Sequence, residues 1–219
     1  MPIAIRHRAD AASSLRPLPD MFVHREDRAL VMSALQRRPL EDMAQRFADG
    51  HRAYVAWHAG EPAAWGWVAT RTATIGELGS TFAIPEGDQY LWNFVTLPAH
   101  RGMGVYPRLL DAIVAAERES AERHWVAFAP ENHASGAGIM KAGFREVAEL
   151  SFDVHGRPAT SDIVPGGART AARLLGLPAA AEKLASCWRC VRNARTSPSS
   201  CHAGPCACDY QQPASGCAA

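Results

Sequence analysis

The chain has 219 residues, of which 47% are hydrophobic and 21% charged, and its formal net charge is +1. This length suits one ordinary domain with a short appendage. The near-neutral charge, without any block of lysine or arginine, argues against nucleic acid as a partner. No apolar run is long enough to span a membrane and the N-terminus shows no secretory signal, so we expect a cytoplasmic protein without membrane contact.

The first half of the chain predicts strands with two helices among them. Residues 3–8 alternate apolar and basic side chains, as in a half-buried strand. Helical patterns follow over about residues 25–37 and over residues 39–50, which begin with a proline and end with a glycine. Two strands joined by a tight turn are expected at residues 53–57 and 64–75. Residues 76–89 predict a loop, with a short strand at its centre as an alternative.

Strands and helices alternate in the second half. The strands are expected at residues 90–97, 124–130 and 144–154, and the helices at residues 105–121 and 134–142. Together with the first half, this order predicts a mixed α/β protein built on one long sheet. The apolar stripe of the longer helix consists of Tyr106, Leu109, Leu110, Ile113 and Ala116.

The C-terminal part of the chain changes in character, so we divide the chain at residues 155 and 186. Residues 156–186 predict a short helical extension, and residues 187–219 are rich in Ser, Pro and Cys and lack the periodicity of a core segment. All six cysteines lie in this last segment, which we expect to be disordered and without metal. The alternative is a zinc site, because Cys-Trp-Arg-Cys has the spacing of one ligand pair. Its ligands would be Cys187, Cys190, Cys201 and Cys206.

The segment V-T-L-P-A-H-R-G-M-G-V-Y-P-R-L-L follows a predicted strand and begins a helix. Gly102 and Gly104 remove side chains where the backbone can approach a ligand closely. The helix start then offers unpaired N–H groups and the positive end of the helix dipole. This arrangement would bind a pyrophosphate, although a strand-to-helix turn can need two glycines for its geometry alone. The segment lacks the third glycine of a Rossmann fingerprint and the Gly-Lys-Ser/Thr of a P-loop.

The loop resembles the acyl-CoA loop of the GNAT superfamily of acyl-CoA-dependent N-acyltransferases. The family signature is Arg/Gln-x-x-Gly-x-Gly/Ala after a strand that ends near a proline; Arg101, Gly104 and Pro98 match it. Tyr106 departs from the signature, because it stands where the family has Gly or Ala. A second segment, N-H-A-S-G-A-G-I-M-K-A-G-F, is similar to the family's second motif. The matching residues there are Asn132, Ser135, Lys141, Gly143 and Phe144.

The resemblance covers about residues 1–155 and implies a GNAT-like α/β (α+β) fold: a mixed, mostly antiparallel sheet with a central splay, flanked by helices. It also implies acetyl-CoA as co-substrate and transfer of the acetyl group, by direct attack, to a primary amine of a small molecule. Two alternatives are a protein or peptide N-acetyltransferase and a non-catalytic acyl-CoA-binding sensor. The oligomeric state is left open, with a homodimer as one alternative.

The resemblance assigns cofactor contacts to three parts of the chain. The strand at Phe94, Val95 and Thr96 would pair with the pantetheine amides like an added strand. Asn132 would bond the pantetheine arm or, alternatively, cap the helix that follows it. The pyrophosphate would be bound by the loop and helix start, which comprise Arg101, Gly102, Met103, Gly104, Val105 and Tyr106.

The proton donor of the family has no counterpart at its usual position. In GNAT enzymes a tyrosine five residues before the phenylalanine of the second motif often serves the leaving thiolate, and here that position is Ile139. An aliphatic side chain cannot donate a proton, so Tyr106 and His133 are the substitutes that the sequence offers. For Tyr106 the alternative is packing on the helix face.

For the general base, the nearest carboxylates upstream of the strand are Glu86 and Asp88; a role as turn residues is their alternative. Asn93, on the strand itself, cannot accept a proton. The predicted strands also carry several tryptophans, for which we expect packing in the core of the sheet, with an apolar acceptor pocket as the alternative. These are Trp57, Trp65, Trp67 and Trp92.

Overall fold

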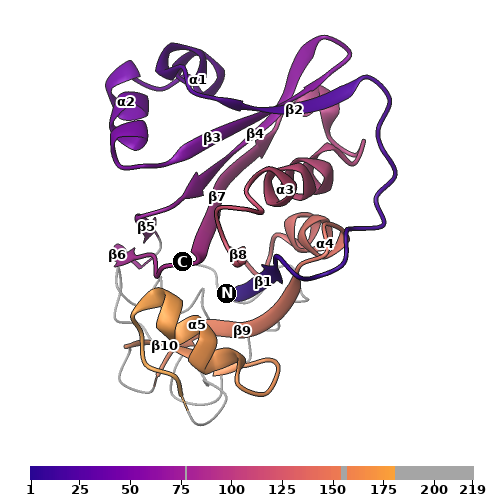
Figure 1. Ribbon diagram of the computed structural model, residues 1–219. Helices are drawn as coiled ribbons and strands as arrows, with labels where there is room; N and C mark the ends of the chain where they lie inside the picture. The colour runs from indigo at the N-terminus through magenta and orange to yellow at the C-terminus, as the bar shows by residue number, and fades with distance from the viewer. Residues whose placement is uncertain (77, 154–156, 181–219) are drawn as a thin grey trace, which may run out of the picture.

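The computed structural model describes residues 1–76, 78–153 and 157–180, which form one large sheet with helices on both faces (Figure 1). The strands are β1 (Pro2–His7), β2 (Met21–Glu26), β3 (Arg52–His58), β4 (Glu61–Ala69), β5 (Thr72–Ile75), β6 (Ser80–Ala83), β7 (Asp88–Thr96), β8 (Arg123–Ala127), β9 (Arg145–Phe152) and β10 (Pro158–Asp162). The helices are α1 (Ala29–Gln36), α2 (Leu40–Ala48), the short 3-10 helix η1 (Pro98–His100), α3 (Val105–Ala116), α4 (His133–Lys141) and α5 (Gly167–Leu175).

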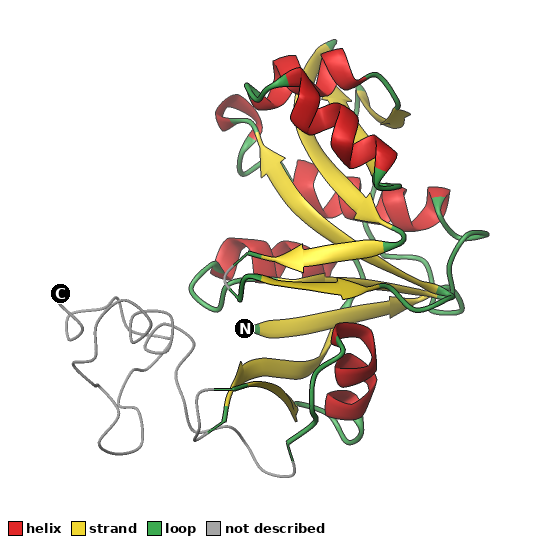
Figure 2. Ribbon diagram, turned by 90° about the vertical axis from the view of Figure 1, so that its left-hand side faces the viewer, coloured by secondary structure: helices red, strands yellow, loops and turns green. Residues whose placement is uncertain are grey.

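The large sheet has the strand order β10-β9-β1-β8-β7-β4-β3-β2, and β5 and β6 form a separate hairpin. Its neighbouring strands are antiparallel except for β7 and β8, which are parallel and are connected through α3. This confirms the mixed, mostly antiparallel sheet flanked by helices. In Figure 2 the strands of the two halves of the sheet fan apart from each other. Among the described residues, no helix is long and apolar enough to cross a membrane.

The divergence of the two halves begins within the parallel pair. β7 and β8 are paired only where Asp88–Leu91 lies beside Arg123–Val126. Beyond Leu91, β7 continues to Thr96 alongside β4, whereas β8 ends at Ala127. The last residues of β7 are correspondingly half-buried, although its first four are buried.

Helices of different parts of the chain cover the two faces of the sheet. Side chains alternate along β4, so Val68 belongs to the core under α3 and α4, whereas Trp67 belongs to the core under α1 and α2. On the side of β9 and β10, α5 and the β5–β6 hairpin enclose a third apolar cluster with Leu174 and Leu175. In Figure 1, α3 and α4 lie together to the right of the sheet, whereas α1 and α2 lie at its upper left. The buried register of α3 confirms the predicted stripe at Leu109, Leu110 and Ile113.

Two parts of the first half differ from the sequence-based expectation. The helix expected from residue 25 begins at Ala29, because Arg25 and Glu26 pair with β3 as the end of edge strand β2. The single strand expected at residues 64–75 is divided into β4 and β5. In the segment that follows, β6 confirms the alternative of a short strand at the centre of the loop. Edge strands such as β2 expose one side to water, so they lack a strong apolar pattern.

The two ends of the described chain both contribute to the sheet. β1 lies between β8 and β9, and Ala4 at its centre is completely buried. β10 pairs with β9 along Pro158–Asp162, and α5 packs beside it. The boundary expected at residue 155 therefore lies between two paired strands of one sheet.

Candidate functional site

The end of β7 carries an irregularity at the point where β8 has left it. The register between β4 and β7 shifts between Trp65 and Trp67, and Asn93 has a φ of 52°. Asparagine tolerates this left-handed conformation better than most residues, and such a shift is a β-bulge that redirects side chains. After the bulge, Phe94 packs into the core under α3, and Val95 packs on the face of α1 and α2.

The ring of Phe94 occupies space that a side chain on the neighbouring strand would need. A Cβ on Gly66 of β4 would overlap this ring, so only glycine fits at that position. On its other side the Phe94 ring meets the ring of Tyr106 from α3, with the centroids 5.5 Å apart in an edge-to-face arrangement. The sequence contains a signal for this contact, since a glycine inside a strand often marks close approach.

The predicted phosphate loop connects β7 to α3. Gly102 and Gly104 have φ values of 78° and 74°, which favour glycine. Gly104 is the N-cap of α3 and no side chain in the described part of the chain caps the helix, so the N–H groups of Val105 and Tyr106 have no capping partner there. These donors and the helix dipole fit an anionic group, and the open edge of β7 beside them fits the amides of an extended ligand.

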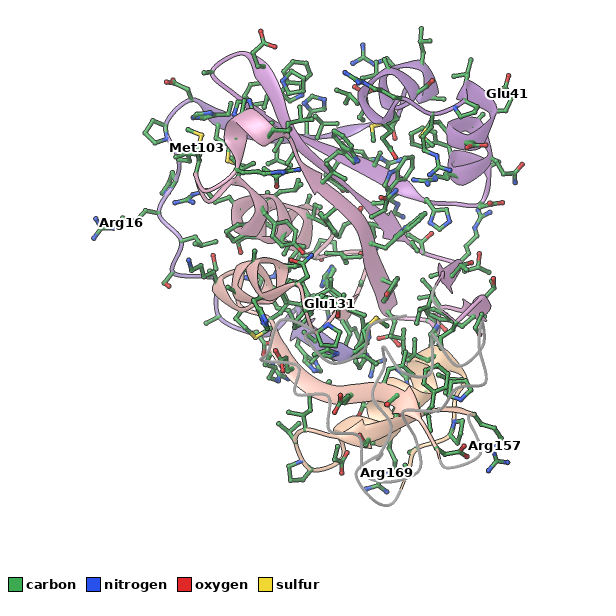
Figure 3. The ribbon with its side chains drawn as sticks, turned by 180° about the vertical axis from the view of Figure 1, so that it is seen from behind. Arg16, Glu41, Met103, Glu131, Arg157 and Arg169 are labelled. Atoms are coloured by element: carbon green, nitrogen blue, oxygen red, sulfur yellow. The ribbon has the colours of Figure 1, made fainter. Side chains whose placement is uncertain are left out.

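Two arginines fix the shape of this loop. Arg101 donates from Nε to the Thr96 carbonyl at 3.2 Å, which folds the loop back on the end of β7. Arg108 donates from one guanidinium nitrogen to the Gly104 carbonyl at 2.8 Å and from Nε to the Arg16 carbonyl at 2.8 Å. The role of Arg108 was not predicted from the sequence, although its spacing of one helical turn from Gly104 is a usable signal. Met103 is 43% exposed, and in Figure 3 Arg16 points away from the molecule.

Tyr106 lies between β7 and α4. Its ring fits against Gly138, where a Cβ would come within 2.5 Å of the ring. Its hydroxyl is 3.4 Å from Ser135 Oγ. Burial raises the pKa of Tyr106 to about 12, while the bond to Ser135 works in the opposite direction. Ile139, at the position of the family's usual tyrosine, is completely buried.

Asn132 precedes α4 and its Oδ1 accepts a hydrogen bond from the Ser135 N–H at 3.0 Å. This confirms the capping interpretation of Asn132. A cofactor contact of the same side chain stays a prediction. His133, the first residue of α4, is exposed.

Glu86 and Asp88 lie at the opposite end of β7 from the phosphate loop. The strand rises by about 3.3 Å per residue, which separates Asp88 from Phe94 by about 20 Å. Asp88 is buried, and its carboxylate accepts hydrogen bonds from Arg123 at 2.5 Å, from Arg173 at 2.7 Å and from Trp125 at 3.0 Å. The structure therefore does not bring these two carboxylates together with the cofactor loop. Glu86 lines a shallow cavity of about 400 Å³ whose other charged residues are Arg8, Glu119 and Glu122.

The face of β7 under α1 and α2 carries an aromatic and polar group of side chains. Trp67 is completely buried and Trp65 is 6% exposed, which confirms core packing for these two tryptophans. Trp92, beside the bulge, is half-buried and meets the ring of His51 with the centroids 5.2 Å apart. Burial lowers the pKa of His51, so its imidazole is neutral at pH 7. No sequence pattern indicates a role for this histidine, which lies in the turn between α2 and β3.

The candidate zinc ligands of the sequence are C-terminal cysteines. Cys187, Cys190, Cys201 and Cys206 lie outside the described residues. Within the described residues, no group of three or more His, Cys, Asp or Glu side chains is arranged to hold a metal ion.

Solved structures resemble this fold at low sequence identity. A GCN5-related N-acetyltransferase from Kribbella flavida is 17% identical with a TM-score of 0.46, over 66% of this chain and 53% of that one. The aminoglycoside N-acetyltransferase AAC(6')-Iy in complex with CoA is 17% identical with a TM-score of 0.46, over 60% of this chain and 96% of that one. An acetyltransferase of the GNAT family from Novosphingobium aromaticivorans is 19% identical with a TM-score of 0.45, over 66% of this chain and 59% of that one. The chain thus spans about half the length of the Kribbella protein.

The sequence itself provides the family assignment. No protein of curated function matches it. Residues 20–144, which are more than half of the chain, match the model of the acetyltransferase (GNAT) family. The matched segment runs from β2 through the bulge and the phosphate loop to the end of α4. The chain therefore belongs to the acetyltransferase (GNAT) family.

Proposed function

We propose that the protein is an N-acetyltransferase that moves the acetyl group of acetyl-CoA to the primary amine of a small molecule. The observation that carries this proposal is the open edge of β7, which continues past Leu91 without β8 and leads into the uncapped start of α3. Family membership makes acetyl-CoA the acyl donor. The amine attacks directly, so both substrates must meet near the bulge.

The chain's own groups account for binding of the donor. The N–H groups of Val105 and Tyr106 face the pyrophosphate, and Arg108 holds the carbonyl of Gly104 so that the loop keeps its shape. Phe94, Val95 and Thr96 offer backbone groups to the pantetheine amides along the edge that β8 leaves open. A main-chain N–H at the bulge polarises the thioester carbonyl, in the manner of an oxyanion hole.

The transfer exchanges one bond for another. The neutral amine nitrogen bonds to the carbonyl carbon, the carbon–sulfur bond breaks, and the nitrogen loses its proton to a base. The thiolate that departs takes a proton from water, so the products are an amide and a thiol. Tyr106 supports the departing sulfur, because its hydroxyl lies between β7 and α4 near Ser135. Its raised pKa makes it a poorer acid than a thiol, so Tyr106 stabilises the thiolate by donating a hydrogen bond rather than by giving up its proton.

For the proton of the attacking amine we propose His51 in place of Glu86 and Asp88. His51 lies on the α1/α2 face of β7 beside Trp92, and its Nδ1 is buried without a hydrogen-bond partner among the described residues. Its lowered pKa keeps the imidazole able to accept a proton at neutral pH. Asp88 is instead held by two arginines about 20 Å from Phe94 along β7.

Two measurements test the proposal. Calorimetric titration with acetyl-CoA is expected to show binding, and no binding at high micromolar cofactor would refute the assignment of the loop. Release of CoA is then measured with a panel of small primary amines and of peptides with free N-termini. Turnover with small amines supports the proposal, turnover with peptides alone replaces it by peptide acetylation, and binding without any turnover replaces it by a sensor role.

A further inference from the structure

A cluster of side chains on the α1/α2 face of β7 is rich in N–H donors and poor in acceptors. We call it the donor cluster; it consists of Gln36, Arg46, Trp67, Trp92 and Asn93. The Arg46 guanidinium carbon lies 5.1 Å from the centre of the Trp67 ring and 4.7 Å from the centre of the Trp92 ring. Gln36 Oε1 accepts hydrogen bonds from Arg46 at 3.3 Å and from Asn93 Nδ2 at 3.4 Å.

The charge of Arg46 has no anionic partner among the described residues. Arg46 is half-buried, and it forms no ion pair within 4.0 Å in the described part of the chain. Two carboxylates of its own helix and its end are used elsewhere: Asp42 pairs with Arg38 at 3.4 Å, and Asp49 accepts from Gln45 at 2.8 Å. The third, Glu41, is exposed in the first turn of α2 and forms no ion pair with Arg46 among the described residues. Burial and the charge of Arg38 lower the pKa of Arg46, against the attraction of Asp42. A partly desolvated cation of this kind gains from a bound anion.

Further donors of the cluster have no acceptor. Gln36 Nε2, Trp67 Nε1 and Trp92 Nε1 are buried and have no hydrogen-bond partner in the described structure. Buried polar atoms are normally paired, so several unpaired N–H groups beside one cation indicate a missing acceptor. In the described structure Gln36 Oε1 already accepts from two donors, which leaves the amide oxygen of Asn93 as the other side-chain acceptor of the cluster.

We propose that the donor cluster binds a carboxylate of the acceptor, so that the substrate is a primary amine that also carries a carboxylate group. A carboxylate supplies two acceptor oxygens and a negative charge, which match the guanidinium of Arg46 and the N–H groups of Gln36 and Trp92. This inference rests on the proposed acetyl transfer and names its substrate class.

The position of the cluster suits such a substrate. Trp92 and Asn93 directly precede Phe94, so the cluster lies about 7 Å along β7 from the proposed thioester position. It lies on the face of α1 and α2, whereas Phe94 and Tyr106 pack on the face of α3 and α4. The two substrates then reach the bulge from opposite faces, and His51 is beside Trp92 to accept the proton of the amine.

The test is a calorimetric titration of the CoA-bound protein with matched pairs of probes. The probes are the common α-amino acids and a series of ω-amino acids, each compared with its own carboxamide. The carboxylates are expected to bind about 10- to 100-fold more tightly, which is the size of one or two charge-assisted hydrogen bonds. Arg46→Gln is expected to abolish this preference, and Arg46→Lys to keep part of it because the charge is retained.

Arg37→Gln serves as the matched control, because Arg37 is exposed at the end of α1, directly after Gln36, and has no ion pair within the described residues. It removes the same charge and should leave the preference for carboxylates intact. Circular dichroism and acetyl-CoA affinity report whether Arg46→Gln is folded. If it is not, Gln36→Met replaces it, and the preference should then fall several-fold.

Equal affinity for carboxylates and carboxamides in the parent protein would overturn the inference, as would a preference that survives in Arg46→Gln or, where that variant does not fold, in Gln36→Met. The kinetic assay separates this outcome from the proposed function. Carboxylate binding without acetyl transfer would refute the acetyltransferase activity and retain the site, whereas acetyl transfer without carboxylate preference would refute only the site.

Discussion

The ring of Phe94 lies directly over the Cα of Gly66 on β4. Any other residue at this position would place its Cβ in the space that the ring occupies. The contact joins the two strands where their register shifts and where β7 parts from β8. It also places Phe94 against Tyr106, the first aromatic residue of α3. The shape of the proposed thioester site therefore depends on the absence of one side chain.

Gly66→Ala is expected to destabilise the protein by about 1–3 kcal/mol, because the added methyl group forces the Phe94 ring out of its position. Acetyl-CoA affinity should fall as well, since the bulge moves with the ring. Urea unfolding and calorimetry measure the two effects. Gly76→Ala is the control: among the described residues nothing lies within 4 Å of a Cβ there, and Gly76 is exposed. Equal stability of the two variants would contradict the prediction.

A second prediction concerns a single glycine of the phosphate loop. Gly104 has a φ of 74°, and a Cβ there would lie 2.5 Å from a guanidinium nitrogen of Arg108. Gly104→Val should therefore distort the start of α3 and weaken acetyl-CoA binding about 10- to 100-fold, the equivalent of one or two charge-assisted contacts. The measurement is the dissociation constant of acetyl-CoA.

Gly166→Val separates this effect from simple backbone strain. Gly166 is the N-cap of α5 with a φ of 80°, and a Cβ there meets no atom of the described residues within 4 Å. The control variant should lose stability by a similar amount and keep its acetyl-CoA affinity. If Gly104→Val also binds acetyl-CoA as tightly as the parent protein does, the pyrophosphate lies elsewhere.

Much of the fold could be predicted because local sequence patterns determine it. The apolar stripe of α3 and the aromatic run of β7 are strong periodic signals, and both elements appear where the sequence indicates them. The edge strand β2 was missed because its alternating residues are only half-buried. The place of β1 between β8 and β9 depends on contacts far apart in the chain, for which a single sequence carries no local signal.

The candidate site could likewise be predicted only in part. The glycines of the phosphate loop are visible in the sequence because backbone conformation restricts the residue type. The general base that we propose was not predictable, because its position depends on which side chains meet across the sheet. Asp88 is close to the phosphate loop in sequence yet is bound to Arg123 and Arg173 at the other end of β7, whereas His51 is remote in sequence yet meets Trp92.

The stability of the protein is expected to depend on pH because of the buried His124. The side chain is completely buried, and burial lowers its pKa to about 4 from the ordinary value of 6.5, against the attraction of Glu117. Between these two values the unfolded chain binds a proton that the folded chain does not, so the free energy of unfolding falls as the pH decreases from 6.5 to 4. Through His124 the free energy of unfolding falls by at most about 3 kcal/mol, and this loss does not increase further once the pH is below the folded-state pKa of about 4.

Calorimetric unfolding between pH 7.5 and pH 4 measures this dependence. His124→Met replaces the titrating group by an apolar side chain of similar length. The free energy of unfolding should then change less steeply with pH between the two pKa values. The slope left in the variant belongs to other groups, among them His7 and His51, whose pKa values burial also lowers. An unchanged slope in His124→Met would show that His124 gains its proton in the folded protein as readily as in the unfolded chain.

Tyr106→Phe tests the support of the leaving thiolate. The substitution keeps the ring, which packs against Phe94 and Gly138, and removes only the hydroxyl near Ser135. Because the hydroxyl acts on charge that develops at the sulfur, kcat should fall about tenfold, the size of one hydrogen bond to a charged group, while the dissociation constant of acetyl-CoA stays the same. Ser135→Ala leaves the tyrosine in place and should lower kcat by much less. If Tyr106→Phe retains the full kcat, the thiolate departs without help from this hydroxyl, and the tyrosine serves only to pack α3 against α4.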